Sequence, residues 1–182
     1  MKDNIVAAIM VSLQMCMLQS CNDTKSNISK MYDQHVHWDV SEMEQYIHQY
    51  FKDNKDLSLS KDYHLIVYSD SMECMSCMTN KLHSWDKLIN YVDSTSKNVD
   101  FIFVFSPMKS ELNNLKVALE MQRFRYPVYI DINHVFSMNN SFIPDESLYH
   151  TFLVDKHFQI RIVGDPRRNP KLMDMFYLEI EK

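Results

Sequence analysis

Two strongly apolar stretches, each with the composition of a buried β-strand, constrain the fold of this chain more than any other feature. The runs DYHLIVYS (62–69) and DFIFVFS (100–106) are too apolar for strands that expose one face to water. Between them, apolar residues recur at helical spacing from about residue 74 to residue 92. Strand, helix and strand in this order form a β-α-β unit. We therefore predict an α/β fold in which helices cover both faces of a central sheet.

Further segments of the chain extend this pattern. Ser41 and Glu44 form a capping-box signature, which predicts a helix over residues 41–53. Beyond the β-α-β unit we expect a helix over 109–124, a strand over 126–131, a loop over 132–148, a hairpin of 149–155 with 158–164, and a last helix from Asn169-Pro170 to Glu179. The predicted architecture is a three-layer α/β/α domain with a mixed sheet, which a β-hairpin and a helix complete.

The N-terminus has the pattern of a targeting segment. The apolar run from Ile5 to Leu18 is too short to span a bilayer and suits the apolar region of a signal peptide. It ends in Leu18-Gln19-Ser20-Cys21, which resembles the lipobox of bacterial lipoproteins, although Gln19 replaces the usual small residue. The resemblance implies that Cys21 carries lipid and becomes the first mature residue. An ordinary cleaved signal and a core helix of a soluble protein are the alternatives.

These features divide the chain into four parts. We predict a signal peptide, a polar tether, an N-terminal helical extension and the main domain, over residues 1–20, 21–40, 41–60 and 61–182.

Charge and glycine content exclude two classes of function. The net charge of the 182-residue chain is −5, and no cluster of Lys and Arg exceeds a pair, so no nucleic-acid partner is expected. The chain has one glycine, Gly164, which rules out a glycine-rich loop that cradles phosphates.

The segment YSDSMECMSCMTNKL (68–82) holds the cysteine pair on which the function depends. Cys74 and Cys77 come directly after a predicted strand, in the first turn of a predicted helix. Unpaired N–H groups and the helix dipole at that position lower the pKa of a cysteine thiol. Cys74 would then attack a substrate disulfide and Cys77, one turn later, would resolve the mixed disulfide, with no diffusible cofactor. Half of a metal site and two inert buried thiols are the competing interpretations.

A CxxC motif in this setting resembles the thioredoxin arrangement, and the resemblance extends over residues 60–180. FIFVFSP looks like the following strand, and YPVYIDINHVFSMNNSFIPDESLYHTFLVDKHFQIRIVGDP is similar to the later half of thioredoxin-like lipoproteins of Gram-negative bacteria. The resemblance implies a protein in the cell envelope, anchored to a membrane by lipid and facing the periplasm or the cell surface. Its partner would be a protein thiol, a protein disulfide or an electron-donor protein. Glu73, His150, Thr151 and Gly164 would border the substrate groove.

Three positions depart from the thioredoxin pattern. His150 stands where the family has a cis-proline, and a cis bond before a residue other than proline costs roughly 2.5–4 kcal/mol, so we expect a trans peptide there. Glu73 replaces the tryptophan before the first cysteine and would raise the pKa of Cys74. Tyr68 takes the place of the buried acid in the preceding strand.

These departures leave two alternative functions open. Cys74, Cys77 and His150, with methionines interleaved in MECMSCM, could bind Cu(I), which prefers soft sulfur ligands, as a metallochaperone does. The chain could also be a non-catalytic thioredoxin-like accessory domain. Arg167 and Arg168 follow the hairpin in a loop that would border the groove, where they could favour a thiolate, guide an acidic partner or simply be solvated.

Overall fold

The structure is a computed structural model, and it describes residues 23–54, 60–71 and 79–182. The predicted signal peptide and the predicted lipidation site Cys21 lie outside these residues, as do Glu73, Cys74 and Cys77.

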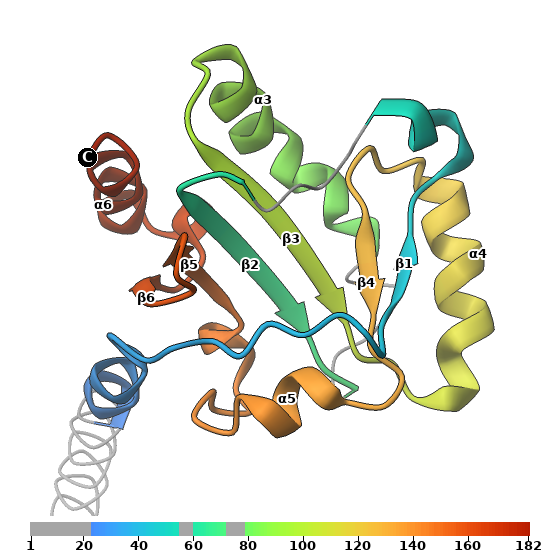
Figure 1. Cartoon of the computed structure of the whole chain (residues 1–182), viewed down its shortest axis with the longest axis horizontal. Coiled ribbons are helices and arrows are strands. Elements are labelled where there is room, and N and C mark those ends of the chain that lie inside the picture. Colours follow the sequence, from blue (N-terminus) through green and yellow to red (C-terminus); the bar gives the residue numbers. More distant parts are fainter. Residues whose placement is uncertain (1–22, 55–59, 72–78) are drawn as a thin grey trace, which may run out of the picture.

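A six-stranded mixed sheet forms the centre of the fold, in the order β1-β4-β3-β2-β5-β6 (Figure 1). The parallel strands β2, β3 and β4 are adjacent, while β1 pairs antiparallel with β4, β5 with β2, and β6 with β5. The strands are β1 (Glu44–Tyr46), β2 (Tyr63–Ser69), β3 (Val99–Phe105), β4 (Val128–Ile130), β5 (Thr151–Asp155) and β6 (Ile160–Val163).

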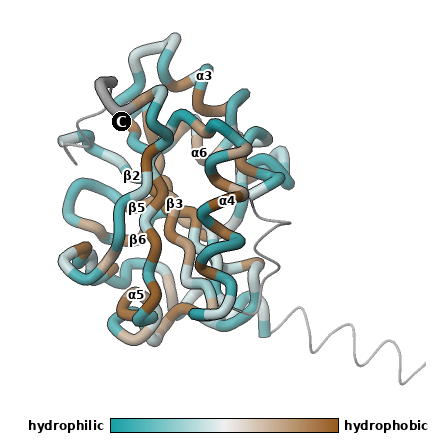
Figure 2. Tube along the Cα trace, turned by 90° about the vertical axis from the view of Figure 1, so that its right-hand side faces the viewer, coloured by the Kyte–Doolittle hydropathy of each residue, from teal (hydrophilic) through white to brown (hydrophobic). Residues whose placement is uncertain are grey.

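Both faces of the sheet are covered, so the fold has three layers. Side chains alternate along β2: Leu65 and Val67 enter one core, and Ile66 and Tyr68 enter the other. The first core includes apolar residues of α3 (Asp86–Ser94), α4 (Leu112–Gln122) and α6 (Pro170–Glu179); the second includes α5 (Val135–Asn139) and the segment 31–38. Figure 2 shows hydrophobic residues concentrated along β3, which has both cores against it. This arrangement confirms the predicted α/β class with a mixed sheet.

The apolar strands and the end of the chain agree with the sequence prediction. The two buried runs are β2 and β3, and the C-terminal hairpin and helix are β5, β6 and α6. Asn169 caps α6 by accepting a hydrogen bond from the Lys171 N–H at 2.9 Å, with Pro170 at the first helical position. In the described part of the helix expected over 74–92, a 3₁₀ turn, η2 (Leu82–Trp85), leads into α3.

The helix predicted over residues 41–53, within the predicted helical extension 41–60, is wrong. Strand β1 lies there instead, and a 3₁₀ helix, η1 (Gln49–Asn54), follows it. The backbone of β1 pairs with the edge of β4, and the Tyr46 hydroxyl donates a hydrogen bond to Glu120 on α4 at 2.5 Å. Lys116 of α4 forms an ion pair with Glu44 at 2.7 Å. Pairing with an available sheet edge therefore outweighs the local capping signal.

The segment expected as a tether, residues 21–40, is packed on the fold over much of its length. Residues 23–31 are helical, and Met31 is fully buried. The following residues run beside β6: the Asp33 N–H donates to the Ile160 carbonyl at 3.2 Å, and the Val36 N–H donates to the Phe158 carbonyl at 2.8 Å. Burial of apolar side chains and hydrogen bonds to the backbone along the edge of β6 hold the segment in place. The sequence did not reveal these contacts. None of the described helices is long and apolar enough to cross a membrane.

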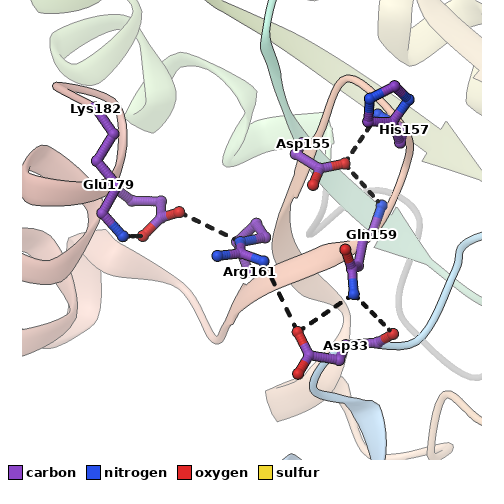
Figure 3. Close-up of polar contacts among 7 residues, drawn as sticks. All are labelled: Asp33, Asp155, His157, Gln159, Arg161, Glu179 and Lys182. Atoms are coloured by element: carbon purple, nitrogen blue, oxygen red, sulfur yellow. Dashed lines mark hydrogen bonds and ion pairs between the residues drawn. The ribbon is translucent and has the colours of Figure 1, made fainter.

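Polar contacts reinforce this N-terminal segment (Figure 3). Arg161 on β6 lies between two carboxylates, 3.8 Å from Asp33 and 3.3 Å from Glu179 at the end of α6. One arginine thus connects the N-terminal segment, the edge strand and the last helix.

Candidate active site

A groove of about 540 Å³ opens at the carboxyl end of β2, and it is the candidate active site. Its walls come from the end of β2, the start of β5, the turn η2 and the loop after β6, which contains the 3₁₀ turn η5 (Pro166–Arg168). The lining residues are Val67, Tyr68, Lys81, Leu82, Trp85, Phe103, Phe105, Ser147, Leu148, His150, Thr151, Asp165, Arg167, Arg168, Asn169 and Leu172.

A rigidly held arginine forms one rim of this groove. The guanidinium of Arg167 lies over the indole of Trp85, with Cζ 3.3 Å from the ring centroid. Its Nε donates to Asp165 Oδ1 at 3.0 Å and its Nη2 to Oδ2 at 2.7 Å, while Nη1 donates to the Ser84 hydroxyl. Asp165 also accepts a hydrogen bond from the Arg167 N–H at 2.9 Å, which starts the turn η5.

His150 forms part of the opposite wall. Its side chain is buried, and its ring centroid is 4.9 Å from that of Tyr68. Its Nε2 lies 3.0 Å from the Pro144 carbonyl oxygen, and in the tautomer that carries the proton on Nε2 it donates a hydrogen bond to that oxygen. The His150 carbonyl accepts a hydrogen bond from the Tyr68 N–H at 2.8 Å. The peptide bond between Tyr149 and His150 is trans, as expected from the sequence.

Thr151 and Gly164 hold the hairpin against β2 and α6. Thr151 lines the groove and is the strand partner of Val67 in the antiparallel pairing of β5 with β2. Its carbonyl oxygen accepts a hydrogen bond from the Gly164 N–H at 2.7 Å. Gly164 has φ of +114°, and a Cβ there would lie 2.8 Å from Leu172 Cδ1. The backbone conformation therefore favours glycine at this position, and a Cβ there would also force the Leu172 side chain to shift.

Comparison with known proteins identifies the fold. No family model matches the sequence, and no curated protein sequence matches it. Among solved structures, the thioredoxin domain of a thiol-disulfide oxidoreductase from Bacteroides vulgatus is similar, with a TM-score of 0.52 and 14% identity over 82% of this chain and 97% of that one. A thioredoxin-like protein from Porphyromonas gingivalis has a TM-score of 0.50 and 15% identity over 81% and 91%. The chain has a thioredoxin-like fold.

Tyr68 stands at the position where the resemblance to thioredoxins would place a buried acid. Burial raises the pKa of Tyr68, so its phenol stays neutral where the resemblance would place a carboxylate. Asp131, at the end of β4, is a buried carboxylate, but it accepts hydrogen bonds from the N–H groups of Val135 at 3.0 Å and Phe136 at 2.8 Å. Those bonds satisfy the first turn of α5, so this acid has a structural task.

His150 and Thr151 line the groove, as do residues of the loop that follows Gly164, whereas Gly164 itself is not among the lining residues. Glu73, Cys74 and Cys77 lie outside the described residues, so the predicted site as a whole stays a prediction. Among the residues that are described, no group of three or more His, Cys, Asp or Glu side chains could hold a metal ion. In the sequence, Tyr68 comes before the cysteine pair and Lys81 after it, and both line the groove.

Sequence reasoning missed the cluster that Trp85, Lys81 and Asp165 form with the predicted arginines. Trp85 has helical spacing with apolar residues, so it indicates a core position, and it is indeed 3% exposed. The signal for the cluster was the dipeptide Asp165-Pro166, since an aspartate before proline caps a short turn and fixes the residues that follow.

Proposed function

We propose that this thioredoxin-like protein carries out thiol–disulfide exchange with another protein through Cys74 and Cys77. One observation carries the proposal: the groove at the end of β2 is lined by residues from both sides of the cysteine pair. In addition, the pair comes in the sequence between a buried strand and a helical segment of a thioredoxin-like fold, and N–H groups at a helix N-terminus would favour a thiolate there.

The exchange needs no reagent other than the dithiol of one protein and the disulfide of the other. The Cys74 thiolate attacks one sulfur of the substrate disulfide, forms a mixed disulfide and releases the other substrate sulfur as a thiolate. The Cys77 thiolate then attacks the Cys74 sulfur, closes the Cys74–Cys77 disulfide and releases the second substrate thiol. Two electrons pass to the substrate, and the reverse sequence oxidises a substrate dithiol.

A redox titration tests this proposal. In a full chain carrying Cys16→Ser and Cys21→Ser, Cys74 and Cys77 are the remaining cysteines. We expect one two-electron transition in glutathione buffers, between about −120 and −270 mV, the range from strong oxidants to thioredoxin. A Cys77→Ser variant should trap a mixed disulfide on Cys74. A pair that never titrates would refute the exchange function and leave an accessory domain.

A metal assay on the same sample addresses the alternative, Cu(I) binding. His150 lines the groove, which favours a site that it would form with Cys74 and Cys77. Near-stoichiometric copper that is lost in His150→Ala would establish this function, whereas a metal-free sample with a normal redox transition excludes it.

We also propose that the protein is held in the cell envelope by lipid on Cys21. The lipobox-like end of the N-terminal apolar run supports this location, since two or more acyl chains give stable anchoring. Expression in a Gram-negative host with labelled palmitate should label the chain and not its Cys21→Ser variant. An unlabelled chain of full length would refute the anchor.

A further inference from the structure

We propose that the groove selects an acidic peptide segment of the partner protein, with Lys81, Arg167 and Arg168 as the cationic rim that binds its carboxylates. The inference rests on the proposed function in one respect, because thiol–disulfide exchange is the reason that a partner protein would bind in the groove. The choice of an acidic peptide follows from the geometry of the described residues.

Arg167 is pre-organised to bind a carboxylate. A guanidinium has five N–H donors, and three of those on Arg167 are used by Asp165 and Ser84. The other two donors have no partner among the described residues, on a side chain that Trp85 and Asp165 hold in place and that is 21% exposed. A group fixed in this way loses little conformational entropy when it binds a ligand.

Positive charges outnumber negative charges among the described residues around the groove. Among the described residues, the Lys, Arg, Asp and Glu side chains that line it are Lys81, Arg167, Arg168 and Asp165, which give three positive charges against one negative charge. Asp165 is already paired, with Arg167 at 2.7 Å and with Arg168 at 3.4 Å. Lys81 and Arg168 are exposed, and both also line a second, shallower hollow of about 240 Å³ beside Asp165 and Ser84. The rim is thus a cationic patch on a chain whose net charge is −5.

The rest of the groove favours a peptide over a small anion or a polyanion. The described lining of the groove also includes apolar side chains, among them Leu172, Phe105 and the exposed Leu148. A segment with an apolar residue next to a glutamate or aspartate would match both parts. The net negative charge of the chain disfavours a nucleic acid, since the phosphates would be repelled outside the patch.

Peptide binding to the full chain in detergent, followed by NMR, tests the inference without using cysteine chemistry. The probes are two blocked hexapeptides without cysteine, one with two glutamates beside a leucine and one with glutamines in their place. We expect the glutamate peptide to bind at least fivefold more tightly at low salt, with the largest shifts at the Trp85 indole N–H and the Arg167 Nε–H. The preference should fall below twofold in 0.5 M NaCl because salt screens the exposed charges.

Variants that remove cations inside and outside the groove locate the effect. Lys81→Gln with Arg168→Gln removes two exposed cations and should reduce the preference for the glutamate peptide to less than twofold. Lys156→Gln is the control, because Lys156 lies in the hairpin turn at the opposite end of β5 and is 61% exposed. Equal affinity of the wild type for the two peptides would overturn the inference, and so would an equal loss in the control.

The two proposals fail in different ways. If the cysteine pair does not titrate but the glutamate peptide is preferred, exchange chemistry is wrong and the acidic-peptide groove stands. If the pair titrates but the two peptides bind equally, exchange stands and the rim does not select the partner.

Discussion

His64, in the middle of the sheet, is expected to make the stability of the protein depend on pH. The side chain is fully buried on β2 and stacks on Phe158, with the ring centroids 5.1 Å apart. Neither ring nitrogen has a hydrogen-bond partner among the described residues, and the nearest carboxylate oxygen, on Asp100, is 3.7 Å from Nδ1. Burial lowers the pKa of His64 from 6.5 to about 4, and the carboxylate of Asp155 opposes this only in part.

The size and sign of the effect follow from this difference in pKa. Below pH 6.5 the unfolded chain takes up a proton that the folded protein takes up only near pH 4. The stability that comes from a neutral His64 is therefore complete above about pH 6.5 and is lost as the pH falls towards 4. With a tenfold difference in proton affinity equal to about 1.4 kcal/mol, the loss between pH 7.5 and pH 4.5 is about 2.5 kcal/mol.

Urea denaturation of the wild type and of His64→Leu at these two pH values measures how much His64 contributes to the pH dependence of the free energy of unfolding. Leucine cannot titrate, so the difference in free energy of unfolding between the two proteins should change by about 2–3 kcal/mol from pH 7.5 to pH 4.5. At pH 7.5 the variant should be close to the wild type, because it removes two ring nitrogens that lack partners. His157→Gln is the control, since its side chain is exposed in the hairpin turn. Parallel stability curves for wild type and His64→Leu would refute the reasoning.

Three further changes test the structure by their effect on unfolding. Gly164→Ala should cost about 1–3 kcal/mol in denaturant titrations, because a residue with a Cβ is strained at φ of +114° and meets Leu172; an unchanged midpoint would contradict that backbone conformation. Asp131→Asn should cost about 1–3 kcal/mol, because the amide cannot accept both hydrogen bonds at the start of α5, whereas an exposed Asp145→Asn should be neutral. Met31→Ala should cost about 2–5 kcal/mol and increase hydrogen exchange over residues 31–36; a variant of wild-type stability would mean that this segment is a tether after all.

The central sheet could be predicted from the sequence because its strands are buried on both faces. In β3, the residues from Phe101 to Phe105 are at most 1% exposed, and such a run has few alternatives to a central strand. The strand β1, at the edge of the sheet, was harder to predict from the sequence. The three residues of β1 carry no strong strand pattern, and their conformation is decided by the free edge of β4, which no local sequence signal reveals.

The N-terminal segment shows the same limit from another side. Its polar composition indicates a tether, yet Trp38 stacks on Phe158 with an interplanar angle of 9°, and Phe158 in turn stacks on His64. These contacts join residues far apart in the chain, so their spacing carries no periodicity. A segment of mixed composition is held in this case by a few large aromatic side chains rather than by an amphipathic pattern.

Parts of the candidate site that are continuous in the sequence are visible as sequence patterns, whereas parts formed by residues far apart in the sequence are not. The motif at residues 74–77 and the hairpin beginning at Thr151 are each visible as short patterns. The rim depends on a contact between residues that are 82 positions apart, Trp85 and Arg167, and no spacing rule predicts it.

That contact also separates the two tasks of the groove. Arg167 covers an indole that belongs to the core, so Trp85 and Asp165 fix its position whether or not a partner is bound. Ser147, Leu148 and Thr151, which also line the groove, are uncharged. Under the two proposals, discrimination by charge comes from the rim and thiol–disulfide exchange from the cysteine motif, so one can be changed by substitution without the other. The exposed Lys81 and Arg168 are where a change of partner would cost the fold least.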